Sequence, residues 1–325
     1  MRLLKDCDYK TFEQLCGLSQ TALKKTLSKY LHAKYKKVIE TKDYLCAEGT
    51  IPVALVAHMD TVFNLPAKDV YYDRVKNVIW SPDGLGADDR AGVFSILQII
   101  KRGLRPHIIF TTDEEKGALG ASVLGKAECP FKELNYIIQL DRRGSNDCVF
   151  YDCDNKDFTE YVEEFGFVEA IGSFSDISMI CPAWKIAGVN LSVGYKDEHS
   201  ISEVLHVGHM LDTIDKVAKM LSEKDIPKFE YIPLAGGYSN WYRFLYANEN
   251  SDNTVCKYCG KTFKPEELIT VKDSSTMGLG YSCIDCITDH VEWCQICGEA
   301  YEVNATNNKF KICEDCLYDS YYSKY

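Results

Sequence analysis

The sequence lacks a long apolar run, an apolar leader and an excess of positive charge. No stretch of its 325 residues approaches the roughly 18 consecutive apolar residues of a membrane-spanning helix. The first residues, Met-Arg-Leu-Leu-Lys-Asp-Cys-Asp, contain no apolar core like that of a secretory leader. The formal net charge is −11 at pH 7, which argues against a general nucleic-acid-binding protein. We therefore expect a chain that acts on neither membranes nor nucleic acids.

The chain has 15 cysteines, but they are not distributed as in a secreted protein held together by disulfides. Eight of them form four Cys-x-x-Cys pairs after residue 255, and the other seven are scattered. In a chain without a leader, paired cysteines at this spacing favour zinc binding in a reducing compartment over secreted disulfides. The sequence thus predicts a cytoplasmic protein.

Residues 1–223 alternate between strand-like and helix-like patterns. Short apolar runs at 52–57, 107–112, 136–140 and 189–193 are typical of strands buried on both faces. Helical periodicity lies before and between them, so we predict an α/β domain whose mostly parallel sheet is covered by helices on both faces. Residues 224–252 show no period and predict an aromatic-rich linker, and 253–325 form a cysteine module.

Residues 84–92, Gly-Leu-Gly-Ala-Asp-Asp-Arg-Ala-Gly, place two carboxylates where a glycine-rich segment turns into a helix. Apolar residues follow at i, i+3, i+4 and i+7, namely Val93, Ile96, Leu97 and Ile100. Asp88 therefore falls at the helix N-terminus, where backbone N–H groups favour a negative charge. Taken alone, a helix cap explains this aspartate.

Residues of metal-ligand type follow four of the predicted strands: His58, Glu114-Glu115, Asp141 and His199. Each has an ordinary structural explanation by itself, such as a hydrogen-bonded histidine, a solvated turn or an ion pair. In open α/β sheets, however, ligands bind outside the carboxyl ends of the strands. Imidazole and carboxylate suit zinc, and a site for two ions needs a bridging carboxylate, for which Asp88 is the natural candidate. Cobalt and manganese remain alternatives to zinc.

The order of these motifs resembles the di-zinc exopeptidase superfamily, which includes zinc aminopeptidases, tripeptidase-type enzymes and related amidohydrolases. The resemblance covers about residues 35–223. It rests on His58-x-Asp60, Gly-Ala-Asp88-Asp89-Arg-Ala-Gly, Asp-Glu114-Glu115-x-Gly, Asp141 and His199-Ser-x-Ser-Glu203. It implies a phosphorylase/hydrolase-like α/β fold. Only 57 residues separate Asp141 from His199, which leaves no room for the dimerisation domain of the tripeptidase and aminoacylase branches.

The resemblance also implies roles for individual residues. Asp88 is expected to bridge two zinc ions, with His58 and Asp141 completing one ion. Glu115 and His199 are expected to complete the other. Glu114 is then the general base. Asp60 orients His58 from behind.

The cysteine module predicts two structural zinc ions, each held by four thiolates. Its pairs are Cys256 with Cys259, Cys283 with Cys286, Cys294 with Cys297, and Cys313 with Cys316. Sequential pairing gives two fingers, and a cross-braced arrangement joins the first pair to the third. Both arrangements stay open. The module is expected to be a structural appendage, a binding site for a protein partner, or a cap over the active site.

A zinc-dependent hydrolase that cleaves an amide bond is the favoured interpretation, most simply an aminopeptidase acting on short peptides. One alternative is a deacylase-type amidohydrolase that acts on acyl-amino acids. The other is an interaction protein in which the hydrolase core is inert. Retention of every expected ligand and of the base favours an enzyme over the last of these.

Overall fold

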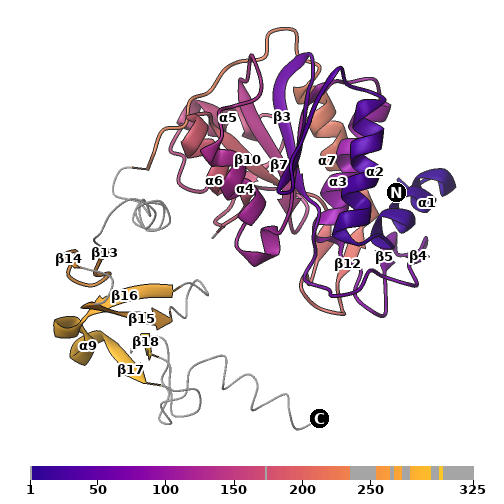
Figure 1. Cartoon of the computed structure of the whole chain (residues 1–325). Helices are drawn as coiled ribbons and strands as arrows, with labels where there is room; N and C mark the ends of the chain where they lie inside the picture. Colours follow the sequence, from indigo (N-terminus) through magenta and orange to yellow (C-terminus); the bar gives the residue numbers. More distant parts are fainter. Residues whose placement is uncertain are drawn as a thin grey trace. The chain divides into compact units, whose positions relative to one another are not determined.

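The computed structural model describes residues 2–172, 174–234, 254–263, 267–272, 279–293 and 300–302. The chain divides into two compact units, Met1–Ala235 and Gly236–Tyr325, shown in Figure 1. Among the residues described, no helix combines the length and apolar character that crossing a membrane requires. The two units are treated separately below.

The first unit is built on an eight-stranded sheet. Its order is β1 (Lys37–Glu40), β2 (Tyr44–Glu48), β6 (Pro106–Thr111), β3 (Ile51–His58), β7 (Tyr136–Arg142), β10 (Gly188–Ser192), β8 (Asp147–Val149) and β9 (Val168–Glu169). The four central strands β6, β3, β7 and β10 are parallel. Their carboxyl ends therefore meet at one edge, and the predicted α/β class is confirmed.

Helices cover both faces of this sheet (Figure 1). Contacts place α2 (Gln20–His32), α3 (Ala87–Lys101) and α7 (Val207–Met220) on one face, and α4 (Leu119–Lys126) and α6 (Asp176–Trp184) on the other. Helix α1 (Asp6–Cys16) contacts α3, and α5 (Lys156–Glu163) contacts β9. Helix α2 begins after Ser19, whose side chain caps the helix by accepting a hydrogen bond from the Ala22 N–H.

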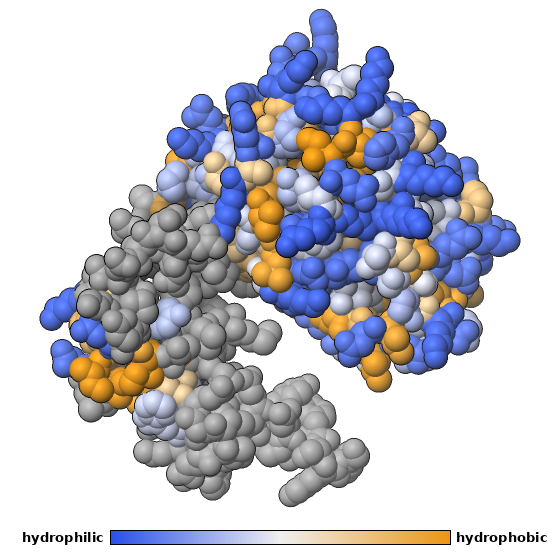
Figure 2. Space-filling model, in the orientation of Figure 1, coloured by the Kyte–Doolittle hydropathy of each residue, from blue (hydrophilic) through white to orange (hydrophobic). Residues whose placement is uncertain are grey.

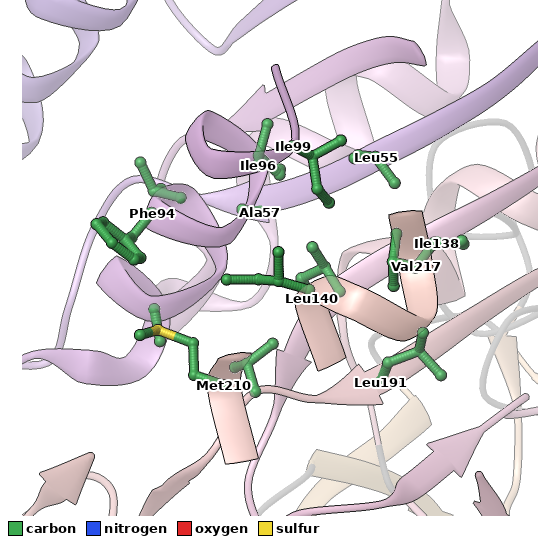
Figure 3. Packing of buried hydrophobic residues seen from close by; sticks show 14 of the residues in the cluster. Leu55, Ala57, Phe94, Ile96, Ile99, Ile138, Leu140, Leu191, Met210 and Val217 are labelled. Atoms are coloured by element: carbon green, nitrogen blue, oxygen red, sulfur yellow. The ribbon is translucent and has the colours of Figure 1, made fainter. Parts of the chain in front are cut away.

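Successive side chains of the central strands point to opposite faces of the sheet, so each strand contributes to an apolar core on both faces. Leu55 of β3 lies beside Ile99 of α3, Ala57 lies nearer to Ile96, and Leu140 of β7 lies near Met210 of α7 (Figure 3). The intervening residues of the same strands are equally buried against the opposite face. Each large apolar side chain removed from water contributes about 1.5–3 kcal/mol. The strand ends are thus fixed by packing that involves no ligand.

A second, antiparallel sheet carries the last predicted ligand. It consists of β11 (Tyr195–Lys196), β12 (Val204–His206), β5 (Val78–Trp80) and β4 (Tyr71–Asp73). The loop between β11 and β12 contains His199, and β5 precedes the glycine-rich segment that leads into α3. This sheet therefore holds the His199 loop beside the start of α3.

The segment after α7 packs on the first unit farther than the predicted boundary at residue 223. Ile226, Phe229 and Tyr231 lie against the main core. The Phe229 ring lies 4.9 Å from that of Phe158, and its carbonyl accepts a hydrogen bond from the Ala187 N–H. The first part of the expected 224–252 linker is therefore an extended strip on the core, and the rest lies outside the described residues.

The outer surface of the first unit is largely hydrophilic on the face seen in Figure 2, with apolar patches between charged areas. This agrees with a strongly acidic chain.

The second unit contains β13 (Thr254–Val255), β14 (Thr262–Phe263), β15 (Leu268–Lys272), β16 (Leu279–Cys283), α9 (Ile284–His290), β17 (Val291–Trp293) and β18 (Ala300–Glu302). Its described apolar core is small, formed by Val271, Val291 and Ala300 with three half-buried neighbours.

Candidate active site

The carboxyl edge of the central strands gathers the predicted ligands. His58 ends β3, Asp141 lies near the end of β7, and the short helix η1 (Glu114–Lys116) follows β6. Their ligand atoms form three groups, each with all atoms within 4.8 Å: His58, Asp88 and Asp141; Asp88, Glu115 and His199; His58, Glu114 and Glu115. Residues from five separate segments therefore meet at one place.

His58 is held from both sides of its ring. Nδ1 lies 3.2 Å from Asp60 Oδ1, and Nε2 lies 2.9 Å from Asp88 Oδ1. The Asp60 carboxylate also accepts the backbone N–H groups of Glu114 and Glu115, at 3.0 and 3.1 Å. The side chain of His58 is 1% exposed. Asp60 thus orients a histidine and the segment that carries both glutamates.

Asp88 lies between two imidazoles. Its Oδ1 faces His58, and its Oδ2 lies 3.2 Å from His199 Nε2. Burial opposes ionisation of Asp88, but hydrogen bonds from His199 and His58 outweigh it and hold the pKa of this carboxyl below its usual value. The Asp88–Asp89 peptide bond is cis. Because Oδ1 faces His58 and Oδ2 faces His199, the two oxygens of Asp88 point toward different sets of candidate ligands.

Two carboxylates that lacked an assigned role support this turn. Glu203 accepts the backbone N–H groups of Ala87 and Asp88, at 3.1 and 3.0 Å. Asp89 accepts the N–H groups of His58 and Gly92. The His199-Ser-x-Ser-Glu203 motif was the only sequence signal for the first of these. Both side chains fix the backbone that positions Asp88.

Asp141 is surrounded by hydrogen-bond donors. Its carboxylate accepts from Tyr195 Oη at 3.0 Å, and from Gln139 Nε2 and Ser175 Oγ, each at 2.9 Å. Asn190 exchanges hydrogen bonds with the Asp141 backbone. Burial, with the charge of Asp88, raises the pKa of Asp141 to about 6. These donors fix which carboxylate oxygen faces His58.

Glu115 and His199 form the open side of the site. Glu115 Oε2 lies 3.1 Å from His199 Nε2, whose side chain is 49% exposed. Glu115 Oε1 is buried and has no hydrogen-bond partner among the described residues. Burial raises the pKa of neighbouring Glu114 well above its usual value. The site therefore has one deeply buried end at His58 and one accessible end at His199.

Residues 39–165 match the family model described as peptidase family M28. This part of the chain resembles the M28 peptidases. Its structure is similar to that of a tripeptidase from Staphylococcus aureus, with 15% identity, a TM-score of 0.53, and coverage of 65% of this chain and 96% of that one. It is also similar to an aminopeptidase from the archaeon Desulfurococcus kamchatkensis, with 13% identity, a TM-score of 0.54, and coverage of 68% and 96%.

An aminopeptidase from Bacillus cereus shows the same likeness, with 15% identity, a TM-score of 0.53, and coverage of 66% of this chain and 97% of that one. At such identities the likeness establishes the fold. None of the curated proteins matches the chain in sequence. The family match and the fold together confirm the expected resemblance to di-zinc exopeptidases.

The donor set at the carboxyl edge of the first unit fits zinc. Histidine nitrogens and carboxylate oxygens are common zinc ligands, and Asp88 belongs to two of the ligand groups. Three carboxylates at the centre of the site need positive charge to offset their mutual repulsion. The unpartnered oxygen of Glu115 is directed to the same cluster. The residues present therefore suit a pair of divalent cations.

The second unit brings the first two cysteine pairs together. Ligand atoms of Cys256, Cys259, Cys283 and Cys286 lie within 4.8 Å of one another. The Cys283 N–H donates to Cys256 Sγ at 3.3 Å. Burial opposes ionisation of the Cys256 thiol, but N–H groups directed at its sulfur lower its pKa to about 6. The other two pairs, Cys294, Cys297, Cys313 and Cys316, lie outside the described residues.

Proposed function

We propose that this chain is a zinc-dependent exopeptidase with aminopeptidase activity on short peptides. The M28 match and the fold shared with a tripeptidase and aminopeptidases support this activity. The observation that carries the proposal is the position of Asp88, whose two oxygens face His58 and His199. This is the arrangement that a bridging carboxylate between two cations requires.

The ligands divide into two sets that share Asp88. His58 and Asp141 belong to the buried set, and Glu115 and His199 to the accessible set. Zinc bound by these residues supplies Lewis-acid chemistry, which activates water and polarises a carbonyl group. The hydrogen bonds around Asp141 and Asp60 hold the ligands in place before substrate arrives.

Glu114 is the general base in this proposal. It takes a proton from the attacking water and delivers it to the departing amine. Its backbone N–H is bound to Asp60, so its position is tied to that of His58. Its side chain is not needed to complete either of the two sets that share Asp88. Glu114 is thereby left free to move protons.

Zinc-loaded protein offered matched libraries of short peptides and acyl-amino acids tests the activity. Release of N-terminal residues from peptides supports an aminopeptidase. Release of acyl groups alone would instead favour the deacylase interpretation. No turnover of either library after zinc, cobalt or manganese is added would contradict an enzymatic function.

For the second unit we propose two structural zinc ions bound by sequential cysteine pairs. Cys256, Cys259, Cys283 and Cys286 hold one ion, which their convergence supports. Cys294, Cys297, Cys313 and Cys316 then hold the other. With the catalytic pair, this gives about four zinc ions per chain. Elemental analysis should show a loss of about one ion for Cys283→Ser. In a cross-braced arrangement the ion held by Cys283 would be shared with the fourth pair, Cys313 and Cys316, so Cys256→Ser and Cys283→Ser would then release different ions. Binding of a protein partner by this unit remains a prediction.

A further inference from the structure

One short segment of the chain, residues 195–203, reaches the candidate site with three polar side chains spaced four residues apart. Tyr195 lies in β11, His199 lies in the loop that follows, and Glu203 immediately precedes β12. Together they contact the segments that carry Asp141 and Asp88. The segment therefore spans the site from one end of the ligand set to the other.

The first end of this segment is fixed to the turn after β7. The Tyr195 hydroxyl donates to Asp141 Oδ1 at 3.0 Å, and the Tyr195 carbonyl accepts the Gly144 N–H at 2.9 Å. Glu198 also pairs with Arg143 at 2.9 Å, but the Arg143 side chain is 59% exposed. Exposed ion pairs contribute little, because water screens them. The two bonds of Tyr195, which is buried, are therefore the main anchor at this end.

The other end of the segment is fixed to the turn that begins α3. The Glu203 carboxylate accepts the backbone N–H groups of Ala87 and Asp88. The next residue, Val204, pairs with Trp80 in the antiparallel sheet. The loop that carries His199 thus hangs between two anchors.

The His199 loop has a backbone conformation that needs such anchors. Asp197 and His199 have positive φ values of 58° and 61°. Residues other than glycine adopt this left-handed region at an energetic cost, and they keep it where surrounding contacts leave no alternative. The side chain of His199 is half exposed, so packing supplies little of this support. The contacts at the two ends of the loop have to supply the rest.

We propose that Tyr195 is a positioning residue that serves both candidate metal positions. Its hydroxyl orients Asp141, which belongs to the buried ligand set. The same hydrogen bond holds the loop that presents His199, which belongs to the accessible set. The metal-binding part of this proposal rests on the exopeptidase function proposed above. The anchoring of the loop depends only on contacts within the chain.

Tyr195→Phe tests the proposal, with Ser175→Ala as the matched control. Phenylalanine keeps the ring that Tyr195 contributes to the main core, so this variant should fold. Ser175 also donates to the Asp141 carboxylate, at 2.9 Å, but it does so from the start of α6. Both substitutions remove one donor from Asp141, whereas only Tyr195→Phe removes an anchor of the loop.

Zinc retention measures the effect on Asp141. The full-length, zinc-loaded proteins are dialysed against graded concentrations of a chelator, and the zinc left per chain is determined by elemental analysis. Loss of a hydrogen-bonding partner behind a metal ligand typically weakens metal binding about 10- to 100-fold. Both variants should therefore release zinc at about a 10-fold lower chelator concentration than the wild type. Thiolate-bound zinc is common to all three proteins and cancels in the comparison.

Amide hydrogen exchange of residues 195–206 measures the anchoring of the loop without metal. It is followed in the same three proteins after the catalytic positions have been emptied by the chelator. Loss of one hydrogen bond should accelerate exchange in this segment roughly 2- to 10-fold in Tyr195→Phe. Ser175→Ala should exchange there at the wild-type rate.

Unchanged exchange in Tyr195→Phe would overturn the proposal, because the hydroxyl would then not hold the loop. Equal acceleration in Ser175→Ala would also overturn it, since this would indicate general loosening around Asp141. Unchanged zinc retention in Tyr195→Phe would overturn its role toward the ligands. A wild-type protein that held only thiolate-bound zinc would overturn the proposed function, and the exchange rates would still decide whether Tyr195 anchors the loop.

Discussion

The two units of this chain gather metal-ligand residues in opposite ways. In the first unit, the candidate ligands stand at strand ends whose positions are fixed by an extensive apolar core. In the second unit, four cysteines converge beside a described core of only three buried residues, Val271, Val291 and Ala300. The first scaffold positions its ligands, whereas in the second the ligands have to hold the scaffold together.

This difference separates catalytic from structural metal binding. A site whose geometry comes from packing can leave coordination positions open for water and substrate. A zinc ion held by four thiolates has no open coordination position. In a small unit of this kind, the free energy of metal binding is also the free energy of folding. The predictions below test this contrast, beginning with the largest effect.

Zinc removal should unfold the second unit and leave the first folded. Structural zinc contributes on the order of 10–16 kcal/mol to small thiolate domains. The first unit has an extensive apolar core, so we expect it to fold without metal. Limited proteolysis after strong chelation should cut residues 253–325 and spare the first unit, whose turnover stops. A chain ending at Glu249 provides the control, because it should retain two zinc ions and small-peptide turnover. An insoluble truncation would show that the second unit is part of the core.

Glu114→Gln should abolish most turnover without loss of metal. A general base typically contributes about 10²–10⁴-fold, and the amide cannot accept the proton. Steady-state kinetics with elemental analysis provide the readout, and Asp88→Ala is the matched variant that should lose both catalytic ions as well as activity. If Glu114→Gln released metal while Glu115→Gln retained it, the assigned roles would be exchanged.

Gly92→Ala should lower the free energy of unfolding of the first unit, because the new side chain would collide with residues at the edge of the sheet that carries the site. A Cβ at this position would lie 2.1 Å from the Leu140 carbonyl oxygen and 2.5 Å from the Asp89 carboxylate. Overpacking of this kind costs about 1–3 kcal/mol. Gly208→Ala in α7 is the control, because its Cβ would meet its nearest neighbour at 3.5 Å. Urea denaturation of both variants measures the difference, and equal midpoints would refute the close approach.

Gln20→Ala should lower kcat modestly while leaving zinc content unchanged. It removes the two hydrogen bonds that tie α2 to Asp113, just before the base. Hydrogen bonds of this type contribute about 0.5–1.5 kcal/mol each, so a decrease of roughly 10-fold is expected. Gln20→Glu keeps one acceptor for the Asp113 N–H and should recover part of the loss. A change in KM alone would contradict a role of Gln20 in positioning the base segment.

Sequence patterns predicted much of this architecture because the relevant forces are local. Apolar runs specified the central strands β3, β6, β7 and β10. The strand-end residues also come together where the general rule for open sheets places them. Roles for individual ligands remain predictions.

The supporting residues were beyond sequence reasoning because their partners lie far away in the chain. Asn190 occupies an apolar strand, and its contact with the Asp141 backbone depends on the pairing of β10 with β7. The Phe229 ring packs against Phe158, a contact that no periodicity in residues 224–252 indicates. The sequence likewise did not show that the first two cysteine pairs lie close together, because this depends on the pairing of β13 with β14 and of β15 with β16.

In the site that we propose, Asp60 connects the residues that bind metal with the residue that transfers the proton. One carboxylate contacts both His58 and the N–H groups of Glu114 and Glu115. Any substitution that displaces it moves a ligand and the base together, so effects of changes at positions 58, 60 and 114 will not add. Residues around the site can therefore change one at a time during evolution. Changes at positions 58, 60 and 114 have to occur together, because each of them displaces the other two.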